Sequence, residues 1–209
     1  FRGTQAIRFI LVPLIDDLLE SEVALRNMKF LADLSRKHGV TTTSELSLGA
    51  VNLDVELELL DQFFNDENGT LRCITVADGR SIRALNDRPC VFVKNLEQRN
   101  TDRQMFRGVR FVAEDSYSAV AIPFENPGGS SGPANPSIAN PGNDLFLQLQ
   151  PWWDFGFHIH VDTDGMIANK ETIETLSSLQ KHRPRFDHRF ICHNFGMSTQ
   201  DQVRKLKML

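Results

Sequence analysis

The sequence predicts an α/β protein built around a parallel sheet. From residue 18 to the end, segments with helical periodicity alternate with short segments rich in β-branched residues. The 209 residues are enough for one domain with a buried core, and no internal repeat is visible. A doubly wound sheet and a (β/α) barrel both fit this alternation, and periodicity does not separate them.

The first half of the chain predicts two helices and up to four strands. Apolar residues at three- and four-residue steps indicate helices at residues 18–38, which Gly39 would close, and at 53–64. β-branched or apolar runs predict strands at 40–44, 71–76, 90–93 and 109–113.

The second half begins with a loop rich in proline and glycine at residues 126–143, which is typical either of a functional lid or of a flexible insertion. Helices are then predicted at 145–155, 167–182 and 199–209, with strands at 157–162 and 189–193. We expect all 209 residues to form one domain.

Composition narrows the class of partner. The net charge is −4 and no cluster of lysine and arginine is present, which disfavours nucleic acid and anionic membranes. No apolar run is long enough for a transmembrane helix. The three cysteines, Cys73, Cys90 and Cys192, have no metal-finger spacing, so we expect reduced thiols in a cytoplasmic protein. We expect the protein to act on a small-molecule substrate.

The stretch FGFHIHVDTDG, residues 155–165, carries the polar groups most suited to chemistry. Because side chains alternate along a strand, His158, His160 and Asp162 share one face, opposite an apolar face. His193 ends the following strand, and the tips of neighbouring parallel strands lie about 5 Å apart. Both imidazoles could therefore bind one metal ion, or could be hydrogen-bonded strand-end histidines without an ion.

At this point the order of segments resembles the amidohydrolase-3 (YtcJ-like) group of the amidohydrolase superfamily. The matching segments, in order, are KHGVTTTSE, NGTLRCITV, FRGVRFVAEDSYS, HIHVDTDG and RPRFDHRFICHNFG. The resemblance implies a (β/α)₈ barrel of which this chain holds about strands two to six. It also implies a hydrolase that cleaves an amide-like C–N bond with metal-activated water.

The resemblance further implies residue roles. His160 and His193 would be ligands of a divalent ion, expected to be zinc, and Asp164 would be a catalytic carboxylate. His158 and His188 would support the ligands through hydrogen bonds.

The chain also departs from the family pattern. Arg110 occupies the fourth-strand position where the family has a lysine, and a guanidinium cannot be carboxylated to bridge two metal ions. The family's first-strand HxH and eighth-strand aspartate are not in this sequence. These departures favour an alternative, a non-catalytic barrel fragment that acts as a binding module. In either case we expect an open sheet to associate into a homo-oligomer.

Overall fold

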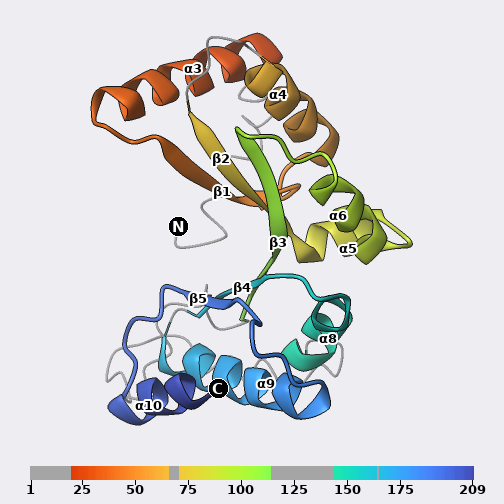
Figure 1. Ribbon diagram of the computed structural model, residues 1–209, viewed down its shortest axis with the longest axis vertical. Helices are drawn as coiled ribbons and strands as arrows, with labels where there is room; N and C mark the ends of the chain where they lie inside the picture. Colours follow the sequence, from red (N-terminus) through yellow and green to blue (C-terminus); the bar gives the residue numbers. More distant parts are fainter. Residues whose placement is uncertain (1–19, 66–70, 114–143, 164) are drawn as a thin grey trace, which may run out of the picture. The chain divides into compact units, whose positions relative to one another are not determined.

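The computed structural model describes residues 20–65, 71–113, 144–163 and 165–209 (Figure 1). Contacts within the chain divide it into two units, Phe1–Arg110 and Phe111–Leu209, which are described separately below. The predicted loop at 126–143 and the carboxylate of Asp164 lie outside the described residues. Among the described helices, none has the length and apolar character needed to cross a membrane.

The first unit contains three strands and four helices in the part of the chain that is described. In chain order they are α3 (Ser21–Lys37), β1 (Thr42–Leu48), α4 (Leu53–Asn65), β2 (Arg72–Asp78), α5 (Gly79–Leu85), α6 (Pro89–Glu97) and β3 (Gln104–Val112), whose last two residues belong to the second unit. β1 pairs with β2, and β2 with β3, both in parallel.

The sequence prediction was wrong for residues 90–93, which form part of helix α6 and not a strand. Pro89 occupies the first turn of this helix, where its missing N–H costs nothing. The apolar run is amphipathic at helical spacing, because Cys90, Val93 and Leu96 are buried while Val91 is exposed. Helix α5 was missed; the side chain of Asp78 caps it by accepting a 2.8 Å hydrogen bond from the N–H of Ser81.

The second unit contains α8 (Leu145–Phe155), β4 (Ile159–Asp162), α9 (Met166–His182), β5 (Phe190–His193) and α10 (Gln200–Met208). β4 and β5 pair in parallel, and α8 packs on β4 and on α9 (Figure 1). Fully buried apolar side chains form the core of this unit: Trp152, Trp153, Ile159, Val161, Leu176 and Leu179. Each of these five elements overlaps a segment predicted from the sequence.

The strands follow the order β1-β2-β3-β4-β5, and each pair whose register is described is parallel. A doubly wound sheet reverses its strand order at a switch point, and this order has no reversal. The chain therefore forms an α/β fold with a five-stranded parallel sheet flanked by helices, and the sequential strand order is consistent with part of a (β/α) barrel. The five strands overlap the five that the sequence assigned to strands two to six.

Candidate functional site

The two candidate ligands lie in contact on neighbouring strands of the second unit. Nδ1 of His160 and Nε2 of His193 are 2.8 Å apart, and the two rings are nearly parallel with centroids 5.0 Å apart. His160 is only 7% exposed, whereas His193 is half-buried. His193 is the last residue of β5, whereas His160 is the second residue of β4, two residues before the carboxyl end of that strand.

The register of the two strands differs slightly from the expectation. His193 is opposite Asp162, and His160 is opposite Ile191, two pairs earlier along the ladder. His160 and Asp162 share a face, so the pairing places His193 on that face too. The imidazole rings therefore meet diagonally across the strand pair, next to the buried side chain of Asp162.

Backbone hydrogen bonds tie this strand pair to residue 113 on one side and tie the ends of its two strands to each other. The carbonyl oxygen of Asp162 accepts a 3.0 Å hydrogen bond from the N–H of Ala113. The carbonyl oxygen of His193 accepts bonds from both the N–H and the hydroxyl of Thr163, each 3.0 Å long. Sequence analysis did not identify Thr163 as a functional residue. Its position directly after Asp162, which lies on the polar face of β4, was the one sign in the sequence that could have pointed to it.

The donor set fits part of a metal site. Two nitrogen ligands of a tetrahedral zinc ion lie about 3.3 Å apart, so the two rings would separate only slightly to hold one. Within the described residues, however, no group of three or more His, Cys, Asp or Glu side chains is placed to bind a single ion. His160 and His193 therefore fit as two ligands of a site that needs further donors.

Cys192 does not supply one of those donors. It precedes His193 in β5, so its side chain lies on the opposite face of the strand. Burial raises the pKa of its thiol to about 11, so the thiol stays protonated at neutral pH.

The structure places His158 and His188 away from the carboxyl ends of the strands. Both precede the strands whose ends carry the candidate ligands. Nε2 of His158 lies 3.2 Å from Nη1 of Arg189, and His188 stacks on Trp153 with ring centroids 5.9 Å apart. These contacts do not join either ring to the pair of His160 and His193.

Arg110 is the last residue of the first unit. It lies near the end of β3 opposite Asp78 of β2, and its guanidinium donates a hydrogen bond to the hydroxyl of Ser47 at the end of β1. The guanidinium of Arg110 is thus hydrogen-bonded to another strand of the sheet, near the carboxyl ends of β1 and β3.

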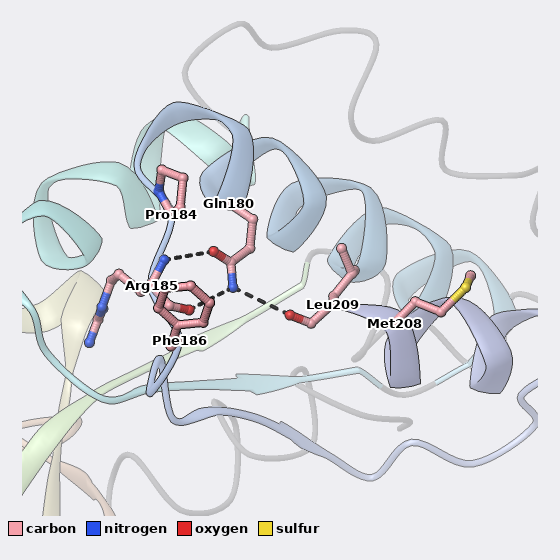
Figure 2. A pocket seen from close by; sticks show the side chains of 6 residues that line it. All are labelled: Gln180, Pro184, Arg185, Phe186, Met208 and Leu209. Atoms are coloured by element: carbon pink, nitrogen blue, oxygen red, sulfur yellow. Dashed lines mark hydrogen bonds between the residues drawn. The ribbon is translucent and has the colours of Figure 1, made fainter.

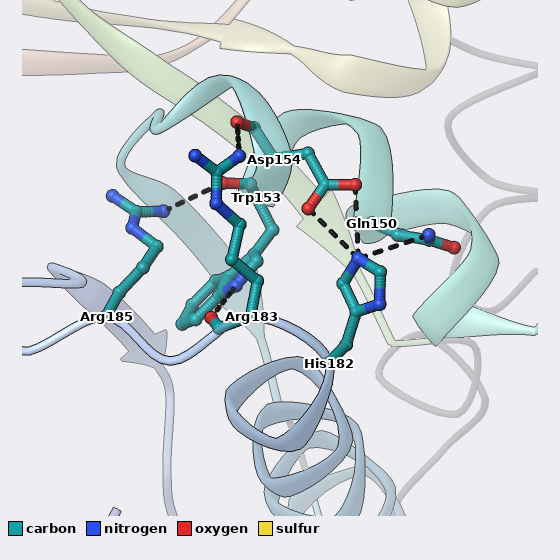
Figure 3. Close-up of polar contacts among 6 residues, drawn as sticks. All are labelled: Gln150, Trp153, Asp154, His182, Arg183 and Arg185. Carbon is teal, nitrogen blue, oxygen red and sulfur yellow. Dashed lines mark hydrogen bonds and ion pairs between the residues drawn. The ribbon is translucent and has the colours of Figure 1, made fainter.

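Other polar groups of the second unit serve helix α8 (Figure 3). His182 lies 3.1 Å from the carboxylate of Asp154, and the indole N–H of Trp153 donates to the carbonyl of Arg183 at 2.8 Å. Arg183 in turn donates to the carbonyl of Asp154 at 2.6 Å. These bonds join the end of α8 to the end of α9.

A cavity of about 280 Å³ lies beside the end of α9 (Figure 2). The amide of Gln180 lines it, but this amide donates to the carbonyls of Arg185 and Leu209 and accepts from the N–H of Arg185. Since the polar side chain at its wall is already bonded within the chain, the cavity is a weaker candidate than the histidine pair.

Comparison with known proteins supports the fold. No protein-family model and no curated protein matches the chain. Two solved structures do match: an uncharacterized metal-dependent hydrolase from Pyrococcus furiosus and one from Pyrococcus horikoshii OT3. Each aligns with a TM-score of 0.64 at 12% identity over 93% of this chain. The chain spans only 38% and 37% of their lengths, so it matches part of a larger fold.

Proposed function

We propose that this chain is the central part of a metal-dependent hydrolase barrel of the amidohydrolase type, which cleaves an amide-like C–N bond. The observation that carries the proposal is the 2.8 Å approach of His160 Nδ1 and His193 Nε2, on parallel strands and with His193 at the carboxyl end of β5. This is the end of the strands at which barrel enzymes have their active sites. The two structures that share the fold are named metal-dependent hydrolases, which supports the same class.

In this proposal His160 and His193 hold a divalent ion, with zinc expected because imidazole nitrogen suits it. The bound ion would lower the pKa of a water molecule and polarise the scissile carbonyl. Asp164, directly after Thr163, remains the proposed catalytic carboxylate. The substrate would be a small molecule, and the whole protein would supply the remaining ligands.

The pair itself must change its protonation pattern to bind an ion. One proton lies between His160 Nδ1 and His193 Nε2 when both rings are neutral, because a hydrogen bond needs one donor and one acceptor. Ion binding requires both nitrogens as lone-pair donors, so the ring that carries this proton must move it to its other nitrogen. ¹⁵N NMR of the side chains would detect this change of tautomer.

Metal titration tests the proposal. After its metal has been removed with a chelator, the protein should bind one zinc ion per chain in calorimetry. His160→Ala and His193→Ala should each weaken binding by more than about 100-fold, because losing a ligand costs more than losing a supporting contact, which costs about 10- to 100-fold. His38→Ala is the matched control, because His38 is an exposed histidine at the end of α3 and its loss should leave zinc affinity unchanged. The titration uses the whole protein, because the proposal assigns the remaining ligands to it, and a whole protein that binds no zinc, manganese or iron stoichiometrically would refute the proposal.

A non-catalytic binding module is the second candidate, and one cavity favours it. The first unit has a cavity of about 310 Å³, a size suited to a small ligand. Its walls are mainly apolar: Met28, Leu48, Val51, Leu59 and Leu60. In this case the wild type would bind no metal ion but would bind an apolar dye in this cavity. The substitution Leu59→Trp, which fills the cavity, would abolish binding of the dye.

A further inference from the structure

The backbone of His193 is held by an unusual pair of hydrogen bonds. Thr163 is fully buried, and both its N–H and its hydroxyl donate to the carbonyl oxygen of His193 at 3.0 Å. A carbonyl oxygen has two lone pairs, so this one residue uses the full accepting capacity of that oxygen. The backbone bond continues the ladder between β4 and β5, and the hydroxyl adds a second restraint at the last residue of β5.

The segment after His193 needs such a restraint. Asn194 and Met197 have φ angles of 54° and 55°, in the left-handed region that residues with a Cβ adopt rarely. A second buried side chain holds the middle of this segment, because Nδ2 of Asn169 donates to the carbonyl of Gly196 at 2.9 Å. Thr163 and Asn169 together are called the carbonyl clamp below.

We propose that the carbonyl clamp positions His193 for metal binding, with Thr163 as its principal member. The inference rests on the proposed function. Thr163 touches no metal or substrate in this scheme and acts through the backbone of His193. If the hydroxyl is lost, β5 can slide or rotate at its end, and the 2.8 Å approach of the His193 ring to His160 is no longer enforced. Strained segments persist where the surrounding structure restrains them, and they are common at functional sites.

The test compares three substitutions of two fully buried threonines, Thr163 and Thr172. Thr163→Val removes the hydroxyl while keeping the side-chain shape, and Thr163→Ser keeps the hydroxyl while removing the methyl group. Thr172→Val is the matched control, because Thr172 is fully buried on α9 and its hydroxyl has no hydrogen-bond partner among the described residues. Zinc affinity is measured by calorimetry at fixed pH, and the melting temperature is measured alongside.

We expect Thr163→Val to weaken zinc binding about tenfold or more, the effect typical of lost contacts behind a metal ligand. Thr163→Ser should restore the affinity and Thr172→Val should leave it unchanged. A Thr163→Val protein that melts at a lower temperature but binds zinc with wild-type affinity would show a purely structural role and overturn the proposal. If Thr163→Val does not fold, Asn169→Ala takes its place, with weaker zinc binding expected and wild-type affinity again overturning it.

The proposal can fail separately from the proposed function. If the wild type binds no zinc, the hydrolase proposal fails, and the side-chain ¹⁵N shifts of His160 and His193 then decide the role of the clamp. Shifts that differ between wild type and Thr163→Val but not between wild type and Thr172→Val would support positioning of the ring. Identical shifts in all three proteins would overturn it.

Discussion

At the scale of single residues, one face of α9 combines buried polar groups with different partners. The amide of Asn169 donates to a carbonyl, whereas its oxygen and the hydroxyl of Thr172 are buried without a hydrogen-bond partner among the described residues. Burying an unpaired polar atom costs free energy, so each of these atoms opposes folding. A hydroxyl that makes a bond and one that makes none should therefore respond oppositely to removal.

We predict that Thr172→Val raises the free energy of unfolding by about 1 kcal/mol, because the hydroxyl that is lost makes no bond. Thr163→Val should lower it by about 1 kcal/mol, since that hydroxyl donates to the carbonyl of His193. Urea denaturation of the two variants measures both values. A loss of stability in Thr172→Val equal to that in Thr163→Val would contradict the assignment.

His188 gives a prediction for pH. Burial lowers the pKa of its imidazole, and the nearby cation of Arg185 lowers it further. The ring is neutral in the folded state, because its Nδ1 accepts a 3.0 Å hydrogen bond from the N–H of Phe190. A lowered folded-state pKa means that the stabilisation is complete above the ordinary pKa of histidine and is lost as the pH falls through the folded-state pKa.

Stability should therefore decrease between pH 7 and pH 5, by at most about 1.4 kcal/mol per pH unit for this one group. His188→Asn retains an acceptor for Phe190 but does not titrate, so its stability should fall less steeply over this range. Urea denaturation at a series of pH values measures both slopes. Equal slopes in the two proteins would rule out a contribution from His188.

At the scale of elements, the cationic side chain of Arg185 binds carbonyl oxygens at the C-terminal end of α8. The helix ends at Gly156, whose φ of 86° suits glycine. The guanidinium of Arg185 then donates to the carbonyls of Gly156 at 3.0 Å and Phe157 at 3.2 Å, and lies 4.7 Å from the ring centroid of Trp153. Arg183 makes one bond, to the carbonyl of Asp154 (Figure 3).

We predict that Arg185→Lys lowers the free energy of unfolding by about 2 kcal/mol, because an ammonium cannot reach several carbonyls and also stack on an indole. Arg183→Lys is the matched control and should cost about half as much, since only one described side-chain bond is lost. Thermal and urea denaturation measure the two costs. Equal costs would show that the stacked, multiply bonded guanidinium has no special role.

The elements also show what sequence could predict. Residues 145–155 were predicted as a helix and form α8 with the same bounds, because a capping Asp144 and a terminal Gly156 flank an apolar run. The short run at 90–93 suits a strand as well as a helix, and only its packing in α6 decides between them. The pairing of His160 with His193 was predictable from alternation. The offset of two residue pairs and the bonds from Thr163 were not, because they depend on strand register.

At the scale of the whole molecule, the strand order leaves two outer strands among those described, β1 and β5. Most of β1 is exposed, from Thr42 to Glu45, and several large apolar side chains are exposed elsewhere, including Phe30 at 65% and Met208 at 78%. An exposed strand edge can pair with another chain, and natural proteins often prevent this with a lysine at the edge. No lysine lies within β1.

We therefore predict that the chain self-associates with rising concentration, as measured by analytical ultracentrifugation. Ser44→Lys places a charge on the exposed part of β1 and should shift the equilibrium toward monomer. Ser178→Lys adds the same charge on the exposed surface of α9 and should leave association unchanged, which separates an edge effect from a change in net charge. If the wild type remains monomeric at every concentration, the edge of β1 is not an association surface. If both variants dissociate equally, the effect is not specific to the edge of β1, and strand pairing there does not control the equilibrium.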